Sequence, residues 1–374
     1  MTKPDVSQYQ SFDQITRRLD DIVGAVRDRD VPGFMVDIRN EPVMKLPPSW
    51  DSAKRMRHWL TSCRAAAREG RPDVLVSVGW SQGWAGGTAS KDPAWCTLDL
   101  DFTDRHYYGP PDRMFRDLKD VDMRALGKPL TMPECGAKCH PTFVKEDPWH
   151  QGDTDEAYTA RFRNLVSHAF GLGATALLSW HWRDPMEGLF PCGMVHATGV
   201  PRPTAALFSR MARTFGKLRL AENPPDVVIR LREEPRMAQD TRMAYLERAY
   251  AVDAALKYWG ANWSKVTESA AGKCSVRLVL DPEALPTDDA AALRRVVGEK
   301  LRTAGCAFTR RAEDPETLET FRVPGEGATG WVFWNGGESP VEARRGGHAV
   351  TVRPDHAGYL QISDDGTLQV REEL

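Results

Sequence analysis

The first part of the chain alternates between short apolar runs and longer amphipathic segments. Five runs rich in apolar residues are typical of parallel strands covered on both faces, and they lie at 34–38, 74–78, 98–102, 128–135 and 174–182. Segments whose apolar residues recur every three or four positions predict helices over 11–29, 50–69, 115–126, 156–170 and 204–218. This alternation predicts an α/β fold in which helical crossovers join parallel strands.

The pattern changes after the proline pair in Glu222-Asn223-Pro224-Pro225, which indicates a boundary. We therefore expect a first domain over 1–222 and a small three-layer α/β domain over 223–322. The second domain should contain strands at 226–231 and 276–280 and helices at 243–259 and 288–304. Short β segments separated by glycine pairs then predict a small β domain over 323–374.

Composition limits the possible partners and compartments. The 374 residues include 50 basic and 52 acidic ones, so no charge field favours nucleic acid or a membrane surface. Seven scattered cysteines and the lack of an N-terminal apolar segment favour reduced thiols and a cytoplasmic protein, although a longer N-terminus could hide a signal peptide. Cys135, Cys139 and His140 do not have a usual zinc spacing, so we expect no metal and no cofactor.

Two glutamates end predicted strands. Glu41 follows the apolar run that begins at Gly33, and Pro42 ends that strand because proline cannot donate to a ladder. Glu134 ends a second short strand and is followed by a turn at Gly136. Since α/β barrels place their chemistry at the carboxyl ends of strands, both carboxylates are candidates for catalysis.

A pair of carboxylates is the minimum requirement for glycoside hydrolysis. One protonates the leaving oxygen, and the other attacks the sugar carbon or activates water. Neither motif is specific alone, because Asn-Glu-Pro is also a common way to leave a strand and Pro-Glu-Cys-Gly is also a common loop.

Four motifs together resemble the clan A glycoside hydrolases, with families 5 and 42 the most similar. They are Asn40-Glu41-Pro42, His106-Tyr107-Tyr108, Pro133-Glu134-Cys135-Gly136 and Trp180-His181-Trp182. The resemblance implies a (β/α)8 barrel in which Glu41 ends strand four as the acid/base. It also implies that Glu134 ends strand seven as the nucleophile and that configuration is retained.

The resemblance implies substrate-binding roles as well. Asn40 would hold the sugar 2-hydroxyl, His106 or Tyr108 would orient the nucleophile, and Trp180 or Trp182 would form the floor under the sugar. Each has a simpler alternative: His106 and Tyr108 as loop aromatics, the tryptophans as core residues, and Asn40 as a turn former. The residues after 225 are similar to the accessory domains of family 42 β-galactosidases, an α/β trimerisation-type domain followed by a small β domain.

The chain departs from the family before Glu41, where only one predicted helix is found. Strands one to three have no counterpart, nor do the arginine of strand two and the histidine of strand three. We therefore expect an incomplete (β/α)8 TIM barrel of strands four to eight. Its open sheet edges, or the tail domains, should favour a homo-oligomer, and the chain alone should have weak or no hydrolase activity.

The sequence thus predicts a retaining β-glycosidase acting on β-galactoside, β-glucoside or β-mannoside substrates, with no nucleic-acid or membrane partner. The alternative is a non-catalytic carbohydrate-binding or oligomerisation protein derived from a glycosidase.

Overall fold

The computed structural model describes residues 35–40, 50–80, 99–108, 111–120, 122–136, 154–184, 193–232 and 239–374. The helix predicted over 11–29 and the candidate acid/base Glu41 lie outside these residues. Among the described residues, no helix is long and apolar enough to cross a membrane.

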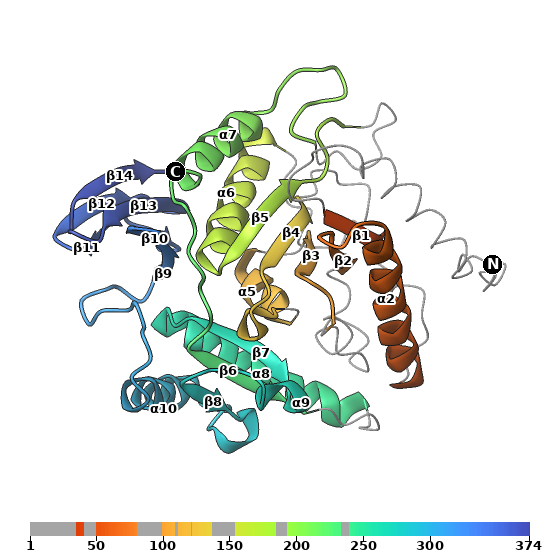
Figure 1. Cartoon of the computed structure of the whole chain (residues 1–374). Helices are drawn as coiled ribbons and strands as arrows, with labels where there is room; N and C mark the ends of the chain where they lie inside the picture. The colour runs from red at the N-terminus through yellow and green to blue at the C-terminus, as the bar shows by residue number, and fades with distance from the viewer. Residues whose placement is uncertain are drawn as a thin grey trace.

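Five parallel strands form one sheet in chain order (Figure 1). They are β1 (Met35–Asn40), β2 (Leu75–Trp80), β3 (Thr103–Tyr107), β4 (Leu130–Cys135) and β5 (Ala174–Ser179). An all-parallel sheet whose neighbours follow the sequence is the wall of a (β/α) barrel, and five strands make only part of one. The predicted incomplete barrel is confirmed.

Helices cover the outer face of this sheet. They are α2 (Trp50–Gly70), α5 (Pro111–Lys119), α6 (Asp155–Gly171) and α7 (Pro203–Phe215). Val36 and Val76 of the sheet pack with Cys63 and Ala67 of α2 in one buried cluster. The sheet and these helices are called the half-barrel below.

The predicted helix over 115–126 is wrong in its extent. Helix α5 ends at Lys119, and a separate 3-10 turn, η3 (Arg124–Leu126), follows. The cause is Asp122, whose Oδ1 accepts the backbone N–H of Arg124 at 3.0 Å and so restarts the chain in a new direction.

The second unit, residues 227–303, is a three-layer α/β structure. Parallel strands β6 (Val227–Leu231), β7 (Trp263–Thr267) and β8 (Leu278–Leu280) pair in the order β7-β6-β8. Helices α8 (Gln239–Trp259) and α10 (Ala290–Thr303) cover one face, and the short α9 (Glu268–Ala271) packs on the other. The 3-10 turn η5 (Pro282–Ala284) follows β8.

The β unit, residues 318–374, contains six strands. They are β9 (Leu318–Gly325), β10 (Ala328–Asn335), β11 (Val341–Arg345), β12 (His348–Val352), β13 (His356–Ser363) and β14 (Leu368–Glu373). Four form an antiparallel sheet, β14-β13-β10-β9, and β11 and β12 form a hairpin. Strand β9 crosses the predicted boundary at 322/323, and the division into domains otherwise stays a prediction.

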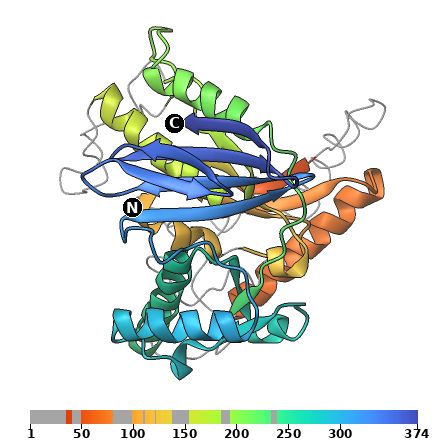
Figure 2. The ribbon, with the colours of Figure 1, turned by 90° about the vertical axis from the view of Figure 1, so that its left-hand side faces the viewer.

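The β unit packs against the half-barrel through aromatic side chains. Phe321 of β9 meets His168 of α6 edge to face, with ring centroids 5.5 Å apart, and Tyr359 of β13 meets Phe170 at 6.3 Å. Figure 2 shows the four-stranded sheet in front of the half-barrel, with the second unit below it in that view.

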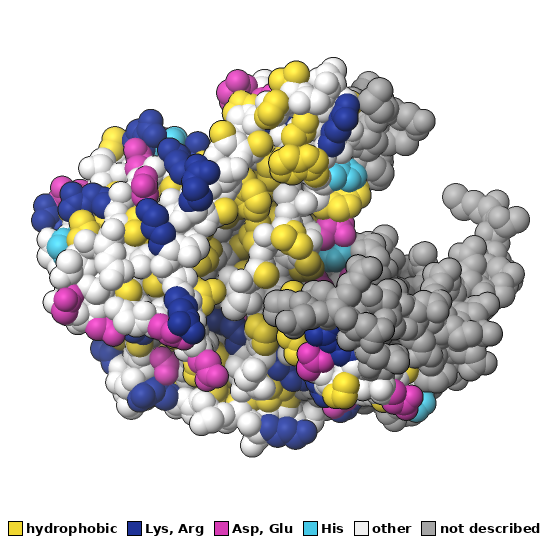
Figure 3. Space-filling model, turned by 45° about the horizontal axis from the view of Figure 1, so that its top comes forward, with side chains coloured by type: hydrophobic (Ala, Val, Ile, Leu, Met, Phe, Trp, Pro, Cys, Tyr) yellow, Lys and Arg dark blue, Asp and Glu magenta, His cyan; other side chains and the backbone are white. Residues whose placement is uncertain are grey.

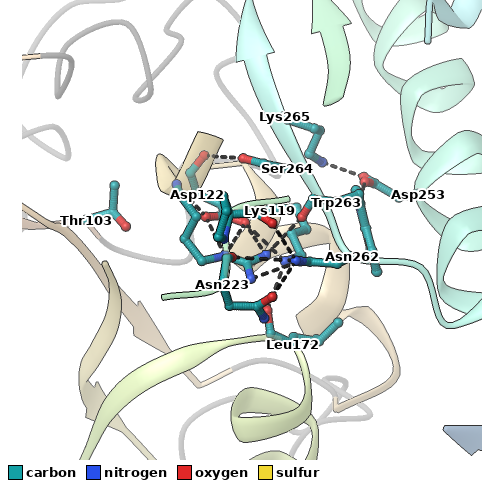
Figure 4. Close-up of polar contacts among 12 residues, drawn as sticks. Thr103, Lys119, Asp122, Leu172, Asn223, Asp253, Asn262, Trp263, Ser264 and Lys265 are labelled. Atoms are coloured by element: carbon teal, nitrogen blue, oxygen red, sulfur yellow. Dashed lines mark hydrogen bonds and ion pairs between the residues drawn. The ribbon is translucent and has the colours of Figure 1, made fainter. Parts of the chain in front are cut away.

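A buried polar cluster joins the second unit to the half-barrel (Figure 4). Asp122 accepts from Lys119 Nζ at 3.0 Å and from Arg124 Nη2 at 2.9 Å, and all three side chains are buried. Arg124 also donates to the Trp263 carbonyl of β7 at 2.9 Å. Because η3 directly precedes β4, this junction lies at the amino ends of the strands, on the rim opposite Glu134.

Candidate active site

Glu134 lies at the carboxyl end of β4, beside the carboxyl end of β3. His106 of β3 pairs with Glu134 in the parallel register, so their side chains share one rim of the sheet. Tyr108 directly follows β3, two residues beyond His106. The parallel sheet therefore brings together three of the residues that the sequence singled out.

The Glu134 carboxylate is held at both oxygens. Tyr108 Oη donates to Glu134 Oε1 at 2.6 Å, and His106 Nδ1 lies 3.3 Å from Oε2. The Glu134 side chain is 19% exposed, so it is reachable from solvent although its neighbours are packed. These two contacts fix the orientation of the carboxylate.

Trp180 lies against this group and Trp182 points into solvent. The Trp180 ring meets the Tyr108 ring at an interplanar angle of 81°, with centroids 5.6 Å apart. Its backbone N–H donates to the Cys135 carbonyl at 2.8 Å, and the Trp180–His181 peptide bond is cis. Trp182 is 73% exposed. Apolar side chains gather in the middle of the face shown in Figure 3. Of the two tryptophans predicted to form the floor under the sugar, Trp180 is the one that packs against Tyr108, the hydrogen-bond donor to Glu134.

Gly136 makes the approach of Trp180 possible. A Cβ at position 136 would lie 2.9 Å from the Trp180 carbonyl oxygen and 3.3 Å from the Tyr108 ring. A side chain there would force the Trp180 backbone or the Tyr108 ring to shift.

Two acidic residues behind Glu134 were missed by the sequence analysis. Asp104 of β3 is 2% exposed, and Asp37 of β1 accepts the Gly79 N–H at 3.1 Å. Burial, together with the charges of Asp37 and Glu134, raises the pKa of Asp104 to about 8, although His106 opposes the shift. The sequence contains a signal for Asp104: Asp104, His106 and Tyr108 are two residues apart, so in a strand their side chains point to the same face.

The remaining candidates lie at the edge of the described chain. Asn40 ends β1 and pairs with Gly79, which places its backbone at the same rim as Glu134, but its side chain lies outside the description. Glu41 is outside it altogether, so the separation of the two carboxyls stays a prediction.

The cysteine considered for metal binding has a packing role. Cys135 is buried and its Sγ donates to the Leu178 carbonyl at 3.1 Å, while burial raises the pKa of its thiol. Cys139 and His140 lie outside the described residues.

The open parallel sheet is part of a (β/α)8 barrel, with a glutamate, a tyrosine and a histidine at its carboxyl rim. Comparison with solved structures supports this fold. No family model matches the chain, and no curated protein matches it.

Among solved structures, the chain is similar to β-galactosidases and to a GH5_18 enzyme. The β-galactosidase of the Antarctic haloarchaeon Halorubrum lacusprofundi is 14% identical with a TM-score of 0.60, over 84% of this chain and 67% of that chain. The β-galactosidase of Bacillus circulans is 10% identical with a TM-score of 0.56, over 83% and 66%.

GH5_18 of Streptomyces cattleya, solved in complex with GlcNAc, is 15% identical with a TM-score of 0.53, over 73% of this chain and 72% of that chain. The chain thus spans about two thirds of the length of these proteins. At such identities the likeness concerns the fold.

Proposed function

We propose that this chain is a retaining β-glycoside hydrolase, with Glu134 as the nucleophile and Glu41 as the acid/base. The observation that carries the proposal is the Glu134 carboxylate, fixed by Tyr108 Oη at 2.6 Å and faced by His106 Nδ1 at 3.3 Å. It lies on the rim where α/β barrels place their catalytic groups.

The reaction has two steps. Glu134 attacks the anomeric carbon while the leaving oxygen takes a proton from the Glu41 carboxyl, which gives a glycosyl ester on Glu134. The Glu41 carboxylate then removes a proton from water, the water oxygen attacks the same carbon, and Glu134 leaves as a carboxylate. Inversion occurs twice, so the β configuration is retained.

Trp180 and Asn40 would bind the sugar. Trp180 offers a flat apolar surface under the sugar ring, and Asn40 would hold the 2-hydroxyl. We propose β-galactosides, β-glucosides or β-mannosides as substrates, because the fold is shared with β-galactosidases and with an enzyme solved with GlcNAc.

Hydrolysis of the 4-nitrophenyl β-galactoside, glucoside and mannoside tests the proposal. Because the barrel is incomplete, we expect at most slow turnover. Where turnover is measurable, Glu134→Gln should lower it at least about a thousandfold. Glu299→Gln, on the exposed face of α10, is the matched control and should have no effect.

Two outcomes would contradict the proposal. One is turnover that survives Glu134→Gln. The other is sugar binding by calorimetry without turnover of any substrate, which would favour the non-catalytic carbohydrate-binding alternative. Proton NMR of the first product separates retention from inversion, because retention releases the β-anomer first.

A further inference from the structure

A cluster of acidic side chains surrounds His106 behind the candidate nucleophile. Among the described residues, carboxyl groups from three strands face the His106 ring: Asp37 of β1, Asp104 of β3 and Glu134 of β4. His106 and Asp104 are each 2% exposed, whereas Asp37 is exposed. Three strands thus direct carboxyl groups at one imidazole.

Gly79 of β2 is the point at which Asp37 and His106 meet. A Cβ on Gly79 would lie 2.4 Å from His106 Nε2 and 2.9 Å from Asp37 Oδ2. Both atoms therefore rest against the same bare face of this glycine. The other oxygen of Asp37 accepts the Gly79 N–H at 3.1 Å, which fixes the direction of the carboxylate.

The two nitrogens of the ring consequently face different groups. Nδ1 lies 3.3 Å from Glu134 Oε2, while Nε2 faces Asp37 and lies 3.9 Å from Asp104 Oδ1. A hydrogen on Nδ1 would point at the nucleophile. In a neutral ring the Asp37 carboxylate would draw the single hydrogen to Nε2, so Nδ1 carries a hydrogen as well only in the doubly protonated imidazolium, which carboxylates on both sides of the ring stabilise. His106 is 2% exposed, so its packed surroundings hold the ring beside Glu134.

We propose that Asp37 is a positioning residue, whose carboxylate on the Nε2 side of His106 favours the doubly protonated ring so that Nδ1–H donates to Glu134. Asp104 adds a second negative charge on that side only as it ionises. The absence of a side chain at Gly79 is what admits this arrangement. The inference rests on the proposed role of Glu134 as nucleophile, and neither aspartate needs to touch substrate.

Asp37→Asn is the discriminating variant. The amide oxygen of asparagine can still accept the Gly79 N–H, so the link between β1 and β2 is kept while the negative charge is removed. Asp73→Asn is the matched control, because Asp73 pairs with Arg71 just before the amino end of β2, at the opposite end of the strand from the rim.

Nitrogen-15 NMR of the histidine rings in the full chain, assigned with His106→Gln, provides a readout that needs no substrate. In the unmutated chain near pH 7 we expect a proton on His106 Nδ1. Asp37→Asn should move the His106 titration midpoint down by about half a pH unit or more, because the Asp37 charge favours the protonated ring. The expected shift is modest because Asp37 is exposed and solvent screens its charge. Asp73→Asn should leave it unchanged.

Asp104 has a separate signature. Because its pKa lies near 8, its ionisation should produce a second step in the His106 ring shifts around that pH, and Asp104→Asn should remove this step. The unmutated chain supplies this result even if the variant does not fold.

The inference is overturned if Nδ1 of His106 lacks a proton near pH 7, or if Asp37→Asn titrates like Asp73→Asn. Its failure is distinguishable from failure of the proposed function. Turnover that depends on Glu134 with unaltered His106 titration removes only the positioning role, whereas the expected NMR shifts without turnover remove only the hydrolase.

Discussion

At the scale of single residues, the account depends on how Glu134 is held. Its carboxylate has one short hydrogen bond from Tyr108 and one close ring nitrogen from His106. A charge-assisted bond of this kind is stronger than a neutral one and fixes the orientation of the carboxylate. The strand-end position pointed to Glu134 in the sequence, and the family resemblance implied roles for Tyr108 and His106. Asp37 and Asp104 were not singled out, because an aspartate within a predicted strand is expected to face solvent.

Tyr108→Phe should lower kcat/KM for the best aryl β-glycoside by about ten- to a hundredfold, because a hydrogen bond to a charged group contributes roughly 1.5–3 kcal/mol. The fold should be retained, since the Tyr108 ring can still meet Trp180. Tyr258→Phe in the second unit is the control. Unchanged kcat/KM in Tyr108→Phe would mean that the hydroxyl does not serve the reaction.

At the scale of elements, local periodicity predicted whether a segment is a helix or a strand better than it predicted where that element begins and ends. The helices predicted over 50–69 and 156–170 correspond to α2 and α6. Strand β7 was missed because Lys265 in its centre looks exposed. In the fold Lys265 is 1% exposed and is paired with Asp253 and with Asp120 of the half-barrel, a long-range compensation that no local pattern reveals.

The junction at Asp122 carries the prediction at this scale. Asp122→Asn should destabilise the fold by about 3–5 kcal/mol, because it takes the shared carboxylate away from the buried Lys119 and Arg124 side chains. Urea unfolding followed by tryptophan fluorescence measures the change. Glu299→Gln, which removes an exposed ion pair with Arg295, should change stability by less than about 1 kcal/mol. Equal effects in the two variants would contradict a structural role for the junction.

At the scale of the whole molecule, Glu319 connects all three parts. It accepts from His168 of the half-barrel at 2.6 Å and pairs with Lys257 of the second unit at 2.8 Å, while it belongs to β9 of the β unit. Burial alone would raise the pKa of Glu319, but Lys257 and His168 outweigh it and lower the pKa to about 2.

This carboxylate should make the fold sensitive to acid. Because its folded pKa is below the value of about 4.5 for the unfolded chain, its stabilising effect is complete above pH 4.5 and is lost as the pH falls towards 2. Glu319→Gln should therefore lower the urea midpoint at pH 7 and flatten its dependence between pH 4.5 and 2. A variant with the same slope as the unmutated chain would show that Glu319 does not contribute.

The open sheet also leads to a prediction about assembly. In the described part of the sheet, β1 and β5 are the edges, and Met35 and Leu178 on them are 53% and 59% exposed. We expect sedimentation to show a homo-oligomer and Leu178→Asp to shift it towards the monomer. A monomer at all concentrations would contradict association through these edges or the tail domains.

The most direct test of the central claim is to trap the covalent intermediate. A 2-deoxy-2-fluoro-β-glycosyl fluoride reacts with a retaining nucleophile but releases it slowly, so the glycosyl ester accumulates. After incubation and pepsin digestion, mass spectrometry should find one added fluoroglycosyl unit on the peptide that contains Glu134, and none in Glu134→Gln. A label on any other residue, or turnover without a label on Glu134, would contradict the account.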